Sequence, residues 1–566
     1  MSTTESGQTE SGQSESGPRD EQTDRPRGEG ADPPPGTGGA TAADDRSPGR
    51  TWALRALGLG LGLLTWLLLG ASDTLEPDAR TVAAIGVLMA AWWVTEAIPL
   101  SATALVPIIA FPAFGVLPVA EATAAYGDDI VFLFLGGFLI AIAMQKWNLH
   151  RRIALLTLRT VGTSPNRIVL GMMIATAFLS MWVSNTATTL MMLPIGLSVL
   201  ALVAERAGNA GDEVRRGAPL TETLRDPAVR TFGVGLVLSV AWSASIGGLG
   251  TLLGSPPNAI VAGYVSSELG REISFLGWMQ LGVPIVVVFV VLAWLIITRV
   301  LFRSGLTDIP GGREMIQGQL HEMGPTSPAE KRVLAVFAGA AFLWIVPGIL
   351  SEFGAVEAVL PWIGDLDDTA IAIAAGLVLF LLPAATTPPD EPAADRSGGP
   401  RTYRMLLVWD DAQKGLPWGV LLLFGGGLAL ASAVSSSGLD EFIGASVAGL
   451  GVLPILLLVA AVVTIVLLLT EVTSNTATAA TFIPVLGGVA LGIGADSMTL
   501  LIPAALAATC AFMLPVGTPP NAIVFGSGVV TIGQMARGGL VLNVVGIVLI
   551  TVFAWLLGGW ALGLQF

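Results

Sequence analysis

Apolar stretches long enough to cross a lipid bilayer recur along most of the chain, with polar loops between them. A membrane-spanning helix needs about 20 predominantly apolar residues. Stretches that approach or exceed this length lie at 52–71, 81–98, 101–116, 130–145, 231–264, 276–302, 333–350, 369–385, 417–435, 499–528 and 538–564. Two others, 166–203 and 451–495, are longer than one crossing requires. The pattern predicts an all-α polytopic membrane protein embedded in the lipid bilayer.

The composition supports this prediction and argues against several other classes. Of the 566 residues, 53% are hydrophobic and 12% are charged, whereas soluble domains carry about 25% charged residues. The mean hydropathy is +0.74. A net charge of −14 without a basic aromatic patch argues against nucleic-acid binding. A single cysteine and two histidines argue against an intrachain disulfide and a histidine-based metal site.

The first 50 residues differ from the rest of the chain. They are rich in Gly, Ser, Glu, Asp, Thr and Pro and nearly lack large apolar side chains. Such a segment cannot bury enough surface to offset its chain entropy. We therefore predict a disordered acidic tail over 1–50.

Two polar phrases occur twice inside this apolar sequence. Residues 184–189 and 474–479 both begin Ser-Asn-Thr-Ala-Thr, and residues 254–260 and 517–523 both contain Pro-Pro-Asn-Ala-Ile. The first pair is offset by 290 residues and the second by 263, and the difference equals the 27 residues of the polar loop 204–230. The chain is thus predicted to consist of two related halves, 51–330 and 331–566, with that loop as an insertion in the first.

The basic residues indicate how the halves lie in the membrane. We place the tail in the cytoplasm and let each long stretch re-enter the membrane as a hairpin. Only Arg80 and Arg271 of the 28 basic residues then fall outside, as the positive-inside rule favours. In this topology the first hairpin enters from the cytoplasm and the second from outside, so the repeats are inverted. Inverted repeats with broken helices are a recurring transporter plan, with the binding site near the midplane.

The repeated phrases carry groups suited to both a cation and an anion. Asn, Ser and Thr offer oxygen atoms to a hard cation and N–H or O–H donors to a carboxylate, and helix N-termini at a break favour an anion. A further hydroxyl, Ser180 or Thr470, stands four residues before each Ser-Asn-Thr and shares its helix face. A lone Ser-Asn-Thr would more often bond to its own helix or join two helices. Two matched copies favour a binding site.

None of the four phrases contains Lys, Arg or His. A dianion bound near the midplane would therefore lack a cationic partner from the protein, and uncompensated charge is costly there. Bound cations would supply the missing charge. The residues thus predict cation-coupled transport of a small anion.

These residues match a known family. The chain resembles the divalent anion:sodium symporter family in residues 92–100, 134–138, 180–186 and 474–476 and in both Pro-Pro-Asn-Ala-Ile runs. The resemblance covers essentially everything after residue 50. It implies about eleven transmembrane helices with two re-entrant hairpins, a homodimer in the cell membrane with a cytoplasmic N-terminus, and an elevator mechanism between inverted repeats.

The resemblance also implies the site residues. One sodium site matches Ser180, Ser184, Asn185 and Gly254, and the other matches Thr470, Thr473, Ser474, Asn475 and Gly517. Substrate carboxylates would meet Ser184, Asn185, Thr186, Ser474, Asn475 and Thr476, with Ser255 and Thr518 nearby.

The leading interpretation is sodium-coupled uptake of four-carbon dicarboxylates such as succinate, malate or fumarate, with Na⁺ as the coupling ion. A sodium-independent dicarboxylate exchanger and a sulfate or citrate transporter are alternatives of the same architecture. A sodium/proton antiporter would need a buried acid in the broken helices, and Glu96 and Glu471 are the nearest acids in apolar sequence. An enzyme is disfavoured because no nucleophile–base or metal-ligand cluster is visible.

Overall fold

The computed structural model describes residues 47–71, 75–206, 226–306, 311–351, 366–384 and 404–566. Nearly all of the predicted tail and most of the predicted insertion 204–230 lie outside these residues. Apart from an isolated bridge between Pro383 and Met405, the described part of the chain is helical or irregular. It contains nine helices that are long and apolar enough to cross a membrane, together with shorter apolar helices. The expected all-α polytopic membrane fold is confirmed.

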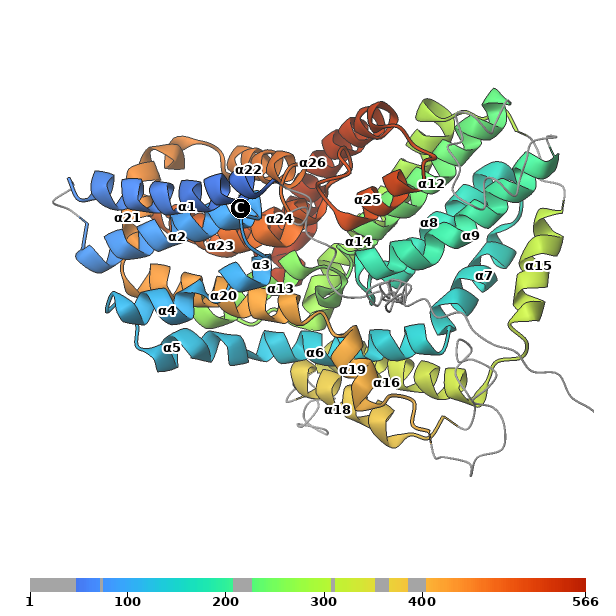
Figure 1. Cartoon of the computed structure of the whole chain (residues 1–566), viewed down its shortest axis with the longest axis horizontal. Coiled ribbons are helices and arrows are strands. Elements are labelled where there is room, and N and C mark those ends of the chain that lie inside the picture. The colour runs from blue at the N-terminus through green and yellow to red at the C-terminus, as the bar shows by residue number, and fades with distance from the viewer. Residues whose placement is uncertain (1–46, 72–74, 207–225, 307–310, 352–365, 385–403) are drawn as a thin grey trace, which may run out of the picture. The chain divides into compact units, whose positions relative to one another are not determined.

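The helices of the first half follow the apolar pattern closely (Figure 1). They are α1 (Pro48–Leu69), α2 (Pro77–Thr95), α3 (Leu100–Thr103), α4 (Val106–Ala113), α5 (Val119–Ala124), η1 (Ala125–Gly127), α6 (Asp129–Lys146), α7 (Leu149–Val161), α8 (Pro165–Ser180), α9 (Asn185–Arg206), α12 (Pro227–Gly247), η2 (Leu252–Gly254), α13 (Pro256–Leu269), α14 (Phe275–Leu295), the π-helical η3 (Ile296–Leu301) and α15 (Gly312–Glu322).

The second half repeats much of this order. Its helices are α16 (Pro328–Ser351), α18 (Asp368–Leu381), α19 (Trp409–Gly415), α20 (Trp418–Ser436), α21 (Leu439–Val447), η6 (Ala448–Val452), α22 (Ile455–Thr470), α23 (Asn475–Gly492), α24 (Ser497–Thr509), α25 (Pro519–Gly526) and α26 (Ile532–Leu562). Helices α7 and α21 begin 290 residues apart, as do α9 and α23. The offset found in the sequence is therefore also an offset between helix starts.

Both long apolar stretches are split at the Ser-Asn-Thr motif. Helix α8 ends at Ser180 and α9 begins at Asn185, and Figure 1 shows the two helices side by side. In the second half α22 ends at Thr470 and α23 begins at Asn475. Each stretch is thus two helices joined by a four-residue turn, the arrangement that a re-entrant hairpin needs. Whether the hairpins re-enter the membrane stays a prediction.

Three ion pairs join loops that the charge map assigns to one side of the membrane. They are Lys146–Asp411 at 2.6 Å, Arg152–Glu330 at 2.9 Å and Arg271–Asp496 at 2.9 Å. The first two pairs connect loops predicted to be cytoplasmic, and the third lies at Arg271, which is predicted to be outside. The contacts are compatible with the proposed topology, whose orientation in the membrane stays a prediction.

A glycine pair occurs in each half, at 136–137 in α6 and at 425–426 in α20, and helix packing explains it. Next to these pairs, Phe134 and Phe424 meet edge to face, with ring centroids 5.0 Å apart. A Cβ atom on Gly136 would lie 2.4 Å from the backbone carbon of Ala372 in α18, and one on Gly426 would lie 2.5 Å from the Ala104 oxygen. Small residues at such positions let the backbones of membrane helices approach closely. These glycines therefore set the helix spacing.

Replacing Gly136 by Val should destabilise the protein. The added side chain would push α6 away from α18, and overpacking of this kind costs about 1–3 kcal/mol. Gly339→Val in α16 is the matched control, because nothing lies within 4 Å of a Cβ atom there. Thermal melting of the detergent-solubilised protein measures the effect. Equal melting temperatures for the two variants would contradict the packing role of Gly136.

Candidate functional site

The first Ser-Asn-Thr motif lies where α8 ends and α9 begins, at a break in the helical backbone. The Ser180 side chain is fully buried and Asn185 is nearly so. The Ser180 hydroxyl donates a hydrogen bond to the Ala244 carbonyl oxygen at 2.7 Å. One terminal atom of the Asn185 carboxamide lies 2.6 Å from Ser180 Oγ, 3.0 Å from the Ala244 oxygen and 3.3 Å from the Gly254 oxygen. Three predicted ligands of the first sodium site thus converge.

The second motif builds the same arrangement from α22, α23 and α24. Thr470 Oγ1 donates to the Ala508 carbonyl oxygen at 2.8 Å. One terminal atom of the Asn475 carboxamide lies 2.8 Å from Thr470 Oγ1 and 3.2 Å from the oxygens of Ala508 and Gly517. The same three kinds of group, a hydroxyl, an Asn side chain and a glycine carbonyl, therefore meet in both halves.

Each cluster brings a hydroxyl and two backbone carbonyl oxygens to one Asn carboxamide. When the carboxamide nitrogen occupies the central position, its two hydrogens point to these three oxygens and satisfy them without a cation. When the carboxamide oxygen occupies it, four oxygens face one another and need a positive charge between them. Two of the four are backbone carbonyl oxygens, one in the last turn of a helix and one in the unwound segment that follows it. Carbonyls at the C-terminal end of a helix carry the negative end of the helix dipole. Half-helix C-termini and unwound carbonyls bind Na⁺ in this way in transporters.

The Pro-Pro-Asn motifs shape the two unwound segments, which are residues 248–255 between α12 and α13 and residues 510–518 between α24 and α25. Asn258 Nδ2 donates to the carbonyl oxygens of Gly248 at 2.8 Å and Thr251 at 2.9 Å. At positions 263 residues later, Asn521 Nδ2 donates to Ala511 and Leu514 at 3.1 Å each. Each Asn thereby fixes the loop that presents Gly254 or Gly517. We missed this role in the sequence, although the repetition of Asn in both motifs signalled it.

Four helices begin at the motifs, two from each half. Helices α9 and α23 begin at the two Asn residues, and α13 and α25 begin directly after Ser255 and Thr518. N–H groups at a helix start can bind an anion. Helices α13 and α25 begin with two prolines, which carry no N–H, and the next N–H in each is bonded to the Ser255 or Thr518 carbonyl. The helix starts with N–H groups suited to an anion are therefore those of α9 and α23.

Thr509, in the last turn of α24, connects the two halves. Its hydroxyl lies 3.0 Å from Ser255 Oγ of the first half, and its carbonyl oxygen lies 3.4 Å from the other terminal atom of the Asn475 carboxamide. Helix α13 also packs against α23 and α24, and α25 packs against α9 and α12. The half-sites are therefore neighbours.

The other predicted site residues are placed as follows. Ser184 and Ser474 directly precede the helix starts, Thr186 and Thr476 lie in the first turns, and all four are partly exposed. Ser255 and Thr518 are buried. The Thr473 hydroxyl is bonded to the Leu469 oxygen and to Thr478 Oγ1. Only the backbone carbonyl of Thr473 is then left for the role that the resemblance implies.

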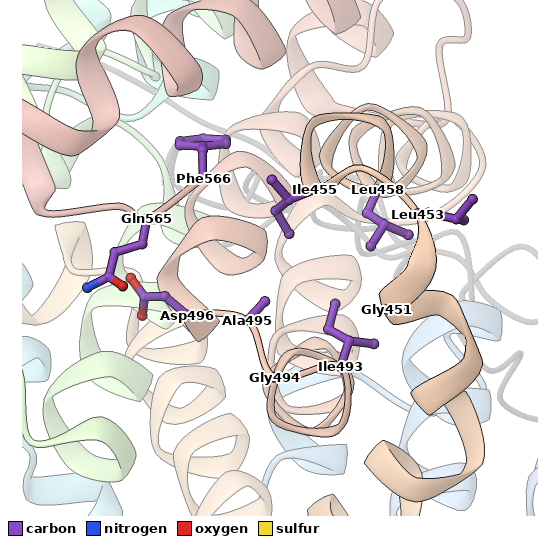
Figure 2. Close-up of a pocket in the computed structure, with 10 residues that line it drawn as sticks. All are labelled: Gly451, Leu453, Ile455, Leu458, Ile493, Gly494, Ala495, Asp496, Gln565 and Phe566. Atoms are coloured by element: carbon purple, nitrogen blue, oxygen red, sulfur yellow. The ribbon is translucent and has the colours of Figure 1, made fainter.

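A separate cavity of about 280 Å³ lies at the turn between α23 and α24 and the C-terminal end of the chain (Figure 2). Its lining includes Leu453, Ile455, Leu458, Asp496 and Phe566 and none of the motif residues. The cavity is therefore separate from the predicted site.

The comparisons with known proteins agree with this geometry. A model of the protein family described as the sodium:sulfate symporter transmembrane region matches residues 51–563. The sodium-dependent dicarboxylate transporter SdcS of Staphylococcus saprophyticus is 42% identical over 512 residues, covering 90% of this chain and 92% of that protein. SdcS of Staphylococcus aureus MRSA252 is 41% identical over 524 residues, covering 92% and 94%. The Alcanivorax borkumensis YdaH transporter has 16% identity and a TM-score of 0.48 over 91% of this chain and 99% of that one, a likeness too loose to carry an argument.

The family match and the SdcS relatives, together with the helical fold, identify a polytopic membrane transporter and not an enzyme. The chain belongs to the sodium:sulfate symporter family, also called the divalent anion:sodium symporter family, as its motifs suggested.

Gly254→Ala and Gly517→Ala should each weaken the response of transport to sodium. A Cβ atom would lie 2.6 Å from the Gly248 oxygen in the first case and 2.7 Å from the Glu471 oxygen in the second. The backbone must shift to relieve this contact, and the carbonyl leaves its cluster. Sodium titration of substrate uptake measures the change, for which we expect a rise in half-saturation of about tenfold, the loss of about 1.4 kcal/mol of binding.

Gly526→Ala in α25 is the matched control, because a Cβ atom there meets nothing within 4 Å. Wild-type sodium dependence in Gly254→Ala and Gly517→Ala would contradict the assignment of these carbonyls.

Proposed function

We propose that the protein is a sodium-coupled symporter of four-carbon dicarboxylates such as succinate, malate and fumarate. The observation that carries the proposal is the pair of matched oxygen clusters at Asn185 and Asn475, each next to helix N-termini. The relatives named as sodium-dependent dicarboxylate transporters support the same coupling ion and substrate class.

In the proposed site, each cluster holds one sodium ion. The first ion is bound by Ser180, Ser184, Asn185 and Gly254. We include the Ala244 carbonyl as a further ligand because it contacts both the Ser180 and the Asn185 side chains. The second is bound by Thr470, Thr473, Ser474, Asn475 and Gly517, with the Ala508 carbonyl. The ligands are neutral, so each bound ion brings a full positive charge into the break.

The substrate then lies between the half-sites. Its carboxylates accept hydrogen bonds from Ser184, Asn185 and Thr186 on one side and from Ser474, Asn475 and Thr476 on the other, with Ser255 and Thr518 at the starts of α13 and α25. The sodium ions and the positive ends of the helix dipoles compensate the dianion. Coupling follows because the anion alone would be left uncompensated in surroundings of low dielectric.

Transport across the membrane needs the site to face each side in turn. We propose an elevator movement in which the two hairpins and the broken helices move as one body against the remaining helices, within a homodimer in the cell membrane. The inverted halves support this proposal, because inversion gives the site two equivalent routes to the two faces. The N-terminus is placed in the cytoplasm by the distribution of Lys and Arg.

Sulfate is a second candidate substrate, because the description of the family model names it. Hydroxyl and N–H donors bind anionic oxygens and do not by themselves distinguish one carbon skeleton from another. A four-carbon dicarboxylate places its two charges at opposite ends, which suits two separate half-sites better than the single centre of sulfate.

Purified protein in liposomes should take up labelled succinate when an inward sodium gradient is imposed. Potassium in place of sodium should abolish uptake, and excess fumarate or malate should compete more strongly than sulfate. Uptake that requires internal dicarboxylate but no sodium would identify an exchanger and refute the proposal.

Asn185→Ala and Asn475→Ala should each abolish sodium-driven uptake while the protein remains folded. Each change removes the central ligand of one cluster, and hydrogen bonds to charged groups contribute about 1.5–3 kcal/mol apiece. Asn166→Ala in α8 is the matched control, since Asn166 lies at the far end of the same helix. Wild-type uptake by either site variant would remove that cluster from the mechanism.

A further inference from the structure

One carboxylate lies beside the second cluster and is used by none of the roles assigned so far. Glu471 follows Thr470 at the end of α22, and its side chain is buried. Its two carboxylate oxygens accept hydrogen bonds from the backbone N–H groups of Phe512 at 2.8 Å, Met513 at 3.0 Å and Leu514 at 3.1 Å. Asn543 Nδ2 in α26 donates a further bond at 2.8 Å. All these donors are neutral, so the negative charge of Glu471 is held in place without being cancelled.

The first half has a neutral residue at the same point. Met181 stands 290 residues before Glu471. Its sulfur would lie 3.1 Å from a Cβ atom on Gly250, the counterpart of Met513 at the 263-residue offset. Met181 therefore packs against the unwound segment in the first half, where Glu471 bonds to it in the second.

The unwound segments differ in a way that explains this exchange. In the first half, the N–H groups of Leu249 and Gly250 bond to the carbonyl oxygens of Ile246 and Gly247, so α12 continues into further turns. In the second half α24 ends at Thr509, and the N–H groups of residues 512–514 bond to Glu471. The carboxylate replaces these turns as the acceptor, and it brings a charge that the first half lacks.

Glu471 lies beside the second cluster along the chain and in space. It is covalently next to the ligand Thr470, and its backbone oxygen would lie 2.7 Å from a Cβ atom on Gly517. Its carboxylate bonds to residues 512–514, which lie in the sequence between the carbonyls of Ala508 and Gly517 that contribute to the cluster. Every ligand assigned to either sodium ion is neutral, so the charge of Glu471 distinguishes the second cluster from the first, where Met181 stands at the same point. A fixed negative charge several ångströms from a cation in partly buried surroundings changes cation affinity by about tenfold or more.

We propose that Glu471 makes the second half-site the tighter of the two sodium sites, while Met181 leaves the first half-site weaker. Glu471 acts as a positioning residue: it fixes the unwound segment before Gly517 and supplies the field that favours the cation. The inference rests on the two sodium sites of the proposed function.

Variants that keep one cluster each test the difference directly. Asn185→Ala retains the second half-site, and Asn475→Ala retains the first. Sodium titration of the purified full chain without substrate, followed by thermal stabilisation, gives the affinity of the remaining site. We expect Asn185→Ala to bind sodium about tenfold more tightly than Asn475→Ala. Equal affinities below that of the wild type, or the reverse order, would overturn the inference, whereas wild-type affinity in both variants would instead reject the sodium-site assignment.

A second pair of variants separates charge from structure. Glu471→Gln removes the charge, and Asn543→Lys neutralises it while leaving the backbone N–H bonds to Glu471 in place. Both should raise the sodium half-saturation of uptake about tenfold and change the succinate KM at saturating sodium much less. Glu96→Gln, at the end of α2, is the matched control and should behave as wild type.

A purely structural role for Glu471 would give a different result. Both variants would then lower the melting temperature or the maximal rate with no change in sodium half-saturation, and that outcome refutes the inference. If Glu471→Gln does not fold, Asn543→Lys and the two Asn→Ala variants still decide the question.

Discussion

The structure depends on how a chain in an apolar environment satisfies backbone groups where its helices break. A broken helix leaves N–H groups free at one end and carbonyl groups free at the other, and lipid offers no partner for either. Four helices begin at such breaks here: α9, α13, α23 and α25. Repeated Asn side chains organise the backbone around them, since Asn258 and Asn521 each hold two loop carbonyls. The proposed cation and anion sites are built from the groups that remain at these breaks.

The same constraint is met differently in the two halves, and the difference has consequences for coupling. Turns beyond α12 satisfy the first unwound segment from within, whereas Glu471 satisfies the second. The carbonyls of helical turns and a carboxylate can both accept hydrogen bonds from the backbone N–H groups of the segment, but only the carboxylate carries a charge. Two halves that share one plan can therefore form one site whose cation positions are unequal.

The sequence was sufficient for much of the fold and for part of the site. The 290-residue offset found in the sequence recurs between the starts of α9 and α23, and the hydroxyls of Ser180 and Thr470 do meet the Asn side chains. The carbonyls of Ala244 and Ala508 could not be predicted, because a backbone atom leaves no mark on residue type. The Glu471–Asn543 contact spans 72 residues and requires the packing of α26. Glu471 had been considered as a proton carrier for an antiporter, and its dense set of donors instead favours a fixed role.

The net charge of the proposed site relates the fixed Glu471 carboxylate to the need for sodium. In the proposed site, the two empty clusters and the Glu471 carboxylate together carry one negative charge. A dicarboxylate bound alone would raise this to three negative charges, in surroundings where each added charge is costly. Two sodium ions bound with the dianion would return the site to one negative charge, the value of the empty site. Under this proposal, Glu471 makes the empty site attractive to a cation and unattractive to the anion. A neutral residue at this position would reduce the difference in electrostatic free energy between the site that holds substrate with sodium and the site that holds substrate alone. Sodium would then be needed less for substrate binding, and the coupling would be weaker.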